Sequence, residues 1–290
     1  MGEKRNRDSG NANSQKKKKF KVSTGFLDPG TSGIYATCSR RHERQAAQEL
    51  QLLFEEKLQE LYGDIDDDEN GSDDDNKGEE ELSIEDQIKK ELQELKGEDS
   101  NKDSTSGETK KKDPLTFIDL NCECVTFCKT RKPIVPEEFV LSIMKDLADP
   151  KNMVKRTRYV QKLTPITYSC NAKMEQLIKL ANLVIGPHFH DPSKVKKDLK
   201  FAVEVTRRNF NTIERMDIIN QVVKLVNKEG SEFNHTVDLK NYDKLILVEC
   251  FKSNIGMCVV DGDYKTKYRK YNVQQIYESK FQEDDDKDVK

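Results

Sequence analysis

The chain has 290 residues, of which 36% are charged and 34% hydrophobic, below the apolar share of about 45–50% in globular domains. The length predicts about two domains. No apolar run approaches the ~18 residues that span a bilayer, so we expect no membrane partner. The seven cysteines follow a polar N-terminal stretch without an apolar signal region, so we expect an intracellular protein with reduced thiols.

The charge is spread unevenly along the chain. Residues 1–31 carry a net charge of +5, residues 64–113 carry −12 and residues 281–290 carry −3. Because the whole chain is −3, the remaining residues 32–63 and 114–280 carry +7. A basic folded part fits a nucleic-acid partner, although charge alone also fits any acidic surface.

Three segments lack periodic apolar residues, and we predict that they are disordered. They are a basic tail at 1–31, an acidic insertion at 64–113 and an acidic tail at 281–290. The lysine cluster at 16–21 is typical of nuclear import signals. We therefore expect a nuclear or nucleolar location, with the cytoplasm as the alternative.

Residues 32–63 and 114–164 are predicted to form the first folded part. Their apolar spacing indicates alternating strands and helices: a strand at 33–38, a helix at 46–61, one long strand at 115–127, a helix at 136–147 and a strand at 158–163. Pro136 and the two acids after it are typical of a helix start. This order is close to a ferredoxin-like half-sheet with helices on one face.

Residues 165–280 are predicted to form the second folded part, again of the α/β class. Its elements are a helix at 172–185, a strand at 201–206, a helix at 216–226 and two strands at 245–251 and 255–260. Gly186-Pro187 is expected to end the first of these helices and Gly230 the second.

Two clusters contain residue types that could bind a metal ion, but neither has the spacing of a common metal site. Cys122, Cys124 and Cys128 lie in an apolar pattern whose alternation puts all three on one strand face, where they would pack as small hydrophobes. His188 and His190 have no third ligand cluster beside them. We expect no metal site.

The sequence contains none of the common phosphate-binding or nucleophile motifs. There is no G-x-x-x-x-G-K-[ST], no G-x-G-x-x-G and no G-x-S-x-G. The closely spaced glycines at a helix start that bind the pyrophosphate of acetyl-CoA are also missing. We therefore predict a protein that is not an enzyme and needs no cofactor. The alternative is an enzyme with an unrecognised site around Cys122–Cys128 or His188–His190.

Three basic clusters remain as candidate RNA-binding residues, because cations neutralise phosphates and tyrosine rings can stack on bases. They are Lys155, Arg156 and Arg158; Arg207, Arg208 and Asn209; and Lys265, Lys267, Tyr268, Arg269, Lys270, Tyr271 and Asn272. If the third cluster is extended, Tyr268 and Tyr271 point to opposite faces, so that one faces RNA and the other the core.

From Gly33 to Tyr277 the chain resembles the eukaryotic THUMP-domain tRNA acetylation adaptors. The match begins at residues 33–38 and is densest in residues 165–265. The matching positions after residue 165 are Phe201-x-Val203-x-Val205-x-Arg207-Arg208, Ile218-Ile219, Val237-Asp238-Leu239, Ile246-Leu247-Val248-Glu249 and Lys270-Tyr271-Asn272. An acidic insertion after the first helix is also a common feature of this family.

The resemblance implies a THUMP domain at 165–280 and a stand-alone adaptor. Such adaptors bind tRNA and assist a separate RNA cytidine acetyltransferase, which makes N4-acetylcytidine in the D-arm. The resemblance thus implies two partners, tRNA and the acetyltransferase. An RNA binder in ribosome assembly is the remaining alternative.

Overall fold

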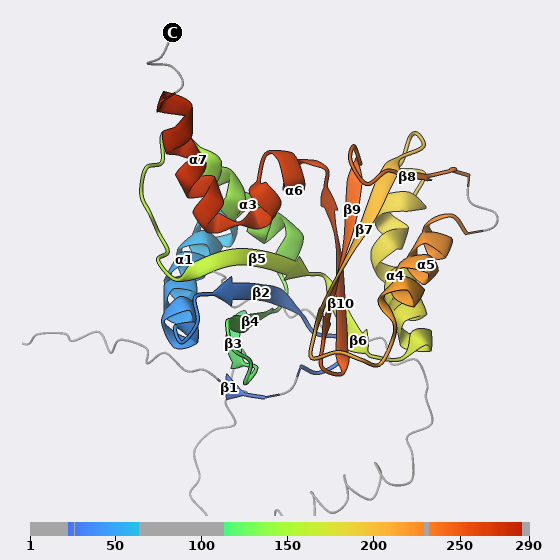
Figure 1. Ribbon diagram of the computed structural model, residues 1–290, viewed down its shortest axis with the longest axis horizontal. Helices are drawn as coiled ribbons and strands as arrows, with labels where there is room; N and C mark the ends of the chain where they lie inside the picture. The colour runs from blue at the N-terminus through green and yellow to red at the C-terminus, as the bar shows by residue number, and fades with distance from the viewer. Residues whose placement is uncertain (1–22, 26, 64–112, 229–231, 286–290) are drawn as a thin grey trace, which may run out of the picture. The chain divides into compact units, whose positions relative to one another are not determined.

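The structure is a computed structural model that describes residues 23–25, 27–63, 113–228 and 232–285 (Figure 1). Residues 1–22, 26 and 286–290 of the two tails and nearly all of the acidic insertion lie outside these residues, so their disorder stays a prediction. The disorder predicted for the rest of the tails is wrong in part, because Ser23–Thr24 form a strand and the helix Val273–Asp285 includes residues 281–285. The described residues form two five-stranded sheets with helices packed against them. The mixed α/β class predicted from the sequence is confirmed.

The first sheet has the strand order β1-β3-β4-β2-β5. Its strands are β1 (Ser23–Thr24), β2 (Ser32–Cys38), β3 (Leu115–Asp119), β4 (Val125–Thr130) and β5 (Val160–Ile166). Its helices are α1 (Glu43–Tyr62) and α3 (Pro136–Ala148). The chain order β2-α1-β3-β4-α3-β5, with antiparallel pairing among these strands, is a ferredoxin-like βαββαβ arrangement, with one strand more than the half-sheet that the sequence predicted.

The single long strand predicted at 115–127 is wrong, because the chain reverses there into the hairpin β3–β4. Asn121 and Cys124 have φ angles of 48° and 62°, in the left-handed region that an extended strand does not visit. The backbone N–H of Asn121 donates to Asp119 Oδ1 at 2.9 Å and closes the turn. Apolar residues continue through the turn, so the alternation did not reveal it.

The helix α1 packs on the first sheet through the apolar stripe that the sequence shows. Ala46, Ala47, Leu50 and Phe54 are buried at spacings of one, three and four residues. The ring of Phe54 lies 6.1 Å from Phe117 of β3 and 5.4 Å from Phe139 of α3, measured between centroids. These contacts fix both helices on one face of the sheet.

The second sheet has the strand order β6-β10-β9-β7-β8. Its strands are β6 (Tyr168–Asn171), β7 (Lys200–Arg208), β8 (Thr236–Val237), β9 (Lys244–Phe251) and β10 (Asn254–Asp261). Helices α4 (Met174–Phe189) and α5 (Arg215–Val226) lie together on one side of it (Figure 1). The chain continues through α6 (Asp263–Thr266), the 3₁₀ turn η1 (Arg269–Tyr271) and α7 (Val273–Asp285).

The expected end of α4 at Gly186-Pro187 is wrong, since this helix continues to Phe189. A proline disfavours helical backbone at the preceding residue through a clash with its Cβ, and Gly186 has none. Phe189 is fully buried against Phe201, with ring centroids 5.7 Å apart. Burial of this ring stabilises the last turn despite the missing N–H of Pro187.

The two sheets meet where β5 runs into β6, with only Thr167 between them. The N–H of Thr167 donates to Met257 O of β10 at 3.0 Å. At Gly256 a Cβ atom would lie 2.8 Å from Ile166 Cγ2, so glycine allows this close approach. The rings of Tyr35 and Phe251 add a contact between the sheets at 6.3 Å.

Candidate nucleic-acid interface

The strands β7 and β9 present different side chains on their two faces. The face toward α4 and α5 is apolar, whereas the opposite face carries Glu204, Thr206 and Arg208 of β7 and Glu249 of β9. We call these four side chains the outer face. Because side chains alternate along a strand, their positions follow from the apolar residues between them. Thr206 pairs directly with Glu249 in the parallel register and donates to its carboxylate.

Two lysines from other elements join the outer face. Lys270 of η1 places its Nζ 2.9 Å from Glu204 Oε2. Lys162 of β5 forms an antiparallel bridge with Asn272 and interacts electrostatically with Glu249, Glu204 and Arg208. The site therefore combines residues of the first sheet, the second sheet and the C-terminal segment.

Burial shifts the pKa values of Glu249 and Lys162 in this site. Glu249 is 6% exposed, and burial raises the pKa of its carboxyl, although Lys162 and Arg208 oppose the shift. Burial likewise lowers the pKa of Lys162, against the pull of Glu249 and Glu204. Lys270 is exposed and Arg208 is half-buried, so Lys270 is the cation that a polyanion would meet first.

The segment 265–272 is not extended, and the alternation expected for its tyrosines is wrong. It forms α6 and η1, and Arg269, Lys270 and Tyr271 all have positive φ angles, of 46°, 56° and 57°. Tyr268 and Tyr271 are each 3% exposed, so neither ring presents a face to a base. Tyr271 packs edge-on against Tyr264 at 4.7 Å.

The remaining side chains of this segment divide into exposed cations and one structural amide. Lys265, Lys267 and Arg269 are exposed, and within the described residues none of them forms an ion pair. Asn272 instead caps α7, since its Oδ1 accepts the N–H of Gln275 at 2.9 Å. The cations of the segment stay RNA-binding predictions, and the amide has a role in the fold.

The cluster at 207–209 is divided between the two faces of the second sheet. Arg208 lies on the outer face, whereas Arg207 turns the other way and lies 3.7 Å from Glu214 Oε2. Asn209 ends the strand with a φ angle of 51°, a conformation that asparagine tolerates better than most residues. Arg208 therefore lies near Lys162 and Glu249 on the outer face, where Lys270 pairs with Glu204, whereas Arg207 does not join this face.

The cluster at 155–158 precedes β5, and its side chains contact α1, α7 and Tyr159. Lys155 Nζ is 5.5 Å from the ring centroid of Tyr277 in α7, and Arg156 forms an ion pair with Glu56 of α1. The guanidinium of Arg158 lies 5.4 Å from the ring centroid of its neighbour Tyr159.

Sequence reasoning missed Lys162, Glu204 and Glu249. Each is a charged residue next to apolar residues within a strand, and this is the signal that would have marked them. A buried charge needs partners, and here the partners come from segments more than 40 positions apart in sequence.

The cysteines and histidines considered for a metal do not cluster as metal ligands. Cys122 and Cys124 lie in the β3–β4 turn rather than on one strand face with buried Cys128, so the expected common face is wrong. His190 Nε2 lies 2.9 Å from Val226 O. Within the described ranges no three His, Cys, Asp or Glu side chains are grouped to hold a metal ion. Those ranges also include no helix long and apolar enough to cross a membrane.

Comparison with known proteins identifies the class. The family model of the THUMP domain matches residues 171–260, within the range predicted from the sequence. The chain is 88% identical over 290 residues to a Saccharomyces cerevisiae protein named tRNA acetyltransferase TAN1, with all of both chains covered. It is 31% identical to a Schizosaccharomyces pombe protein without an assigned function, covering 89% of this chain and 80% of that protein. The chain belongs to this family of THUMP-domain proteins.

One further relative and two solved structures are less similar. THUMP domain-containing protein 1 of Homo sapiens is 30% identical, over 87% of this chain and 66% of that protein. Among solved structures, TrmN from Thermus thermophilus aligns with a TM-score of 0.36 at 14% identity, covering 79% of this chain and 45% of that one. The solution structure of the THUMP domain of THUMP domain-containing protein 1 aligns with a TM-score of 0.27 at 27% identity, covering 31% and 85%.

Proposed function

We propose that this chain is a tRNA-binding adaptor that presents tRNA to a separate RNA cytidine acetyltransferase, which forms N4-acetylcytidine in the D-arm. The observation that carries the proposal is the 88% identity, over the full length, to a yeast protein whose name couples tRNA with acetylation. A function in tRNA modification follows from that likeness together with the THUMP match. The adaptor mechanism is the finer part of the proposal.

The arrangement of cations supports tRNA as the ligand. Lys162, Arg208 and Lys270 meet on the outer face, and Lys265, Lys267 and Arg269 follow in the adjoining segment. Each cation that contacts a phosphate releases condensed counterions, so RNA binding gains free energy at low salt. The outer face is not uniformly positive, because two carboxylates lie among these cations. Since Glu204 holds Lys270 in place, we propose that fixed cations make the contacts with the RNA.

A division of labour supports an adaptor over a self-contained transferase. The whole sequence lacks the closely spaced glycines that bind the acetyl-CoA pyrophosphate at a helix start. We propose that the acetyl donor is bound by the partner protein and that this chain supplies the RNA contacts. The lysine cluster at 16–21 supports a nuclear or nucleolar location for this step.

The printed name of the yeast relative favours a second candidate, in which this chain transfers the acetyl group itself. One experiment separates the two. Purified full-length chain is incubated with acetyl-CoA and unmodified tRNA, with and without the RNA cytidine acetyltransferase, and the nucleosides are measured by mass spectrometry. The adaptor proposal expects N4-acetylcytidine only when both proteins are present. Product formed by this chain alone would overturn it in favour of the transferase.

A further inference from the structure

A second group of cations lies beside the first sheet, where α1 begins and β5 begins. Arg41 and Arg44 flank the start of α1, and Arg158 immediately precedes β5 beside Tyr159. We call these three arginines, together with His42 and Tyr159, the arginine corner. All three arginine side chains are exposed. The corner belongs to the α1 and β5 segments of the first sheet, whereas the outer face lies on β7 and β9.

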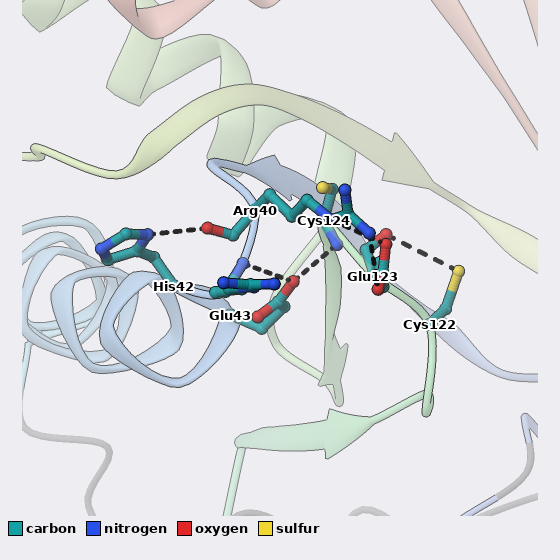
Figure 2. A network of polar contacts seen from close by, with 7 residues as sticks. Arg40, His42, Glu43, Cys122, Glu123 and Cys124 are labelled. Carbon is teal, nitrogen blue, oxygen red and sulfur yellow. Dashed lines mark hydrogen bonds and ion pairs between the residues drawn. The ribbon is translucent and has the colours of Figure 1, made fainter.

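Two glutamates of α1 fix the loops that carry these arginines. Glu43 Oε1 accepts the N–H of Cys124 at 2.8 Å and the N–H of Arg41 at 3.3 Å (Figure 2). Glu49 Oε2 accepts the N–H groups of Arg158 and Tyr159, each at 3.0 Å. The bonds to backbone N–H groups, led by that of Cys124, lower the pKa of Glu43 and keep it ionised. Both carboxylates are therefore engaged with backbone amides rather than with arginine side chains.

The arginines of the corner differ in pairing from their neighbours. Arg40 lies 3.1 Å from Glu123 Oε2 (Figure 2), and Arg156 pairs with Glu56. Within the described part of the chain, Arg41, Arg44 and Arg158 form no ion pair. The fold thus presents three exposed guanidinium groups that have no anionic partner among the residues that the structure describes.

An aromatic pair lies between the arginines. The rings of His42 and Tyr159 stack with centroids 4.2 Å apart and an interplanar angle of 16°. The guanidinium of Arg158 lies 5.4 Å from the Tyr159 ring, and His42 Nδ1 is 2.9 Å from Arg40 O. Cations interleaved with stacked rings are the chemistry that proteins use on single-stranded or looped RNA.

We propose that the arginine corner is a second RNA-contacting surface, which binds backbone phosphates of the same tRNA that the outer face binds. The inference rests on the proposed function, and it adds Arg41 and Arg44 to Arg158, which the sequence already marked as a candidate RNA-binding residue. Guanidinium groups suit phosphates because their planar donors form paired hydrogen bonds. The stacked rings favour RNA over an acidic protein segment, for which unpaired charge alone would suffice.

The test compares two matched double variants of the full-length chain. Arg44→Ala with Arg158→Ala removes two arginines of the corner. Arg215→Ala with Lys224→Ala removes two exposed cations of α5, on the opposite side of the second sheet. Binding to unfractionated tRNA is measured by fluorescence anisotropy from 50 to 300 mM salt, with melting temperatures as the folding control.

We expect the corner variant to lose about tenfold or more in affinity at low salt, and the slope of log K against log salt to become shallower by about 0.7 to 0.9 for each lost contact. The α5 variant keeps the slope of the parent. A corner variant that binds with the affinity and slope of the parent overturns the proposal and leaves the corner free for an acidic protein. An equal loss in both variants overturns it as well, because the effect is then one of net charge.

A third variant guards against a loss caused by misfolding. Arg44→Lys with Arg158→Lys keeps both charges, and we expect it to recover most of the salt slope while losing the paired geometry of guanidinium. Failure to recover any slope in a folded lysine variant would count against phosphate contact. The parent chain separates the two proposals: if it does not bind tRNA at all, the proposed function fails, whereas a binding parent with an unaffected corner variant refutes only this inference.

Discussion

The two faces of the second sheet come from the same strands but are built for different purposes. On β7 and β9 the side toward α4 and α5 carries Val205, Ile246 and Val248, all buried. The other side carries Glu204, Arg208 and Glu249 at the alternate positions. Because one residue step moves a side chain to the opposite face, a strand can stabilise the fold and present charge within the same eight or nine residues.

Substitutions on the two faces of these strands should therefore affect different properties, one face the stability of the fold and the other the binding of RNA. A substitution on the helix-covered side should reduce the free energy of unfolding and leave the RNA contact alone. A substitution on the outer face should do the reverse. The predictions below test that separation, beginning with the largest expected effect.

Ile246→Ala should be the most destabilising of these changes. Ile246 is fully buried between β9 and the helices, so its loss removes apolar contacts and leaves a cavity. Substitutions of this kind cost about 2–5 kcal/mol. Urea unfolding measures the loss, and anisotropy with tRNA under conditions where the variant is folded should show unchanged affinity. A marked loss of affinity in the folded variant would break the separation of the two faces.

Arg208→Ala should weaken tRNA binding while the neighbouring Arg207→Ala should not. The two arginines are adjacent in β7 and point to opposite faces, which makes them a matched pair. Loss of one phosphate contact should reduce the salt slope by about 0.7 to 0.9. Both variants should stay within about 1 kcal/mol of the parent in stability, since both side chains are at least partly exposed. Equal effects of the two substitutions on the slope would refute the assignment of the outer face.

Glu249→Gln should stabilise the protein near neutral pH and lose this advantage in acid. Burial raises the pKa of Glu249 above its usual value of 4.5, so the fold favours the protonated form. The stabilising contribution of that protonated carboxyl is complete below the usual pKa and is lost as pH rises through the raised one. Lys162 and Arg208 face the carboxylate and reduce the effect, and Glu204 adds to it.

The measurement for Glu249→Gln is unfolding by urea at several pH values between 4 and 8. The stability difference between variant and parent should grow with pH in favour of the variant. tRNA affinity at neutral pH should also rise by a few fold, because a negative charge leaves the outer face. A difference that is independent of pH would mean that folding does not shift the pKa of Glu249.

Tyr264→Phe should have the smallest effect, and a stabilising one. The hydroxyl of Tyr264 is buried and has no hydrogen-bond partner within the described residues, so its removal relieves a desolvation penalty of up to about 1 kcal/mol. Tyr277→Phe is the control, because the Tyr277 hydroxyl donates to Met153 O at 3.3 Å and its loss should not stabilise. Thermal melts of both variants measure the contrast. Destabilisation by Tyr264→Phe would indicate a partner for that hydroxyl.

The parts of the fold that the sequence predicted are those with local causes. The helix α3 was predicted almost to the residue, because Pro136 and the acids after it mark its start and its apolar face is regular. The turn between β3 and β4 was missed, since Leu120, Cys122 and Cys124 continue the apolar pattern through residues with left-handed backbone. Periodicity reports burial, and it does not report a reversal that is itself partly buried.

The candidate site was predicted in part for the same reason. Arg208 and Lys270 stand out as members of basic runs, and both lie at the outer face, Lys270 beside Glu204 and Arg208 near Glu249. Lys162 and Glu249 lie in separate strands outside these runs, and only the approach of β5 to the second sheet makes them neighbours. The burial of both Tyr268 and Tyr271 was also beyond sequence reasoning, because consecutive left-handed residues turn this segment back on itself.

The direct passage of β5 into β6 has a consequence for how the chain can be divided. A fragment that begins at residue 165, the predicted start of the THUMP part, would cut within β5 and would separate Lys162 from Glu249. The cationic surface would lose one contributor although every residue of the second sheet was kept. The RNA affinity measured for that fragment would therefore be lower than that of the full chain, because the cationic surface is formed where the two sheets meet.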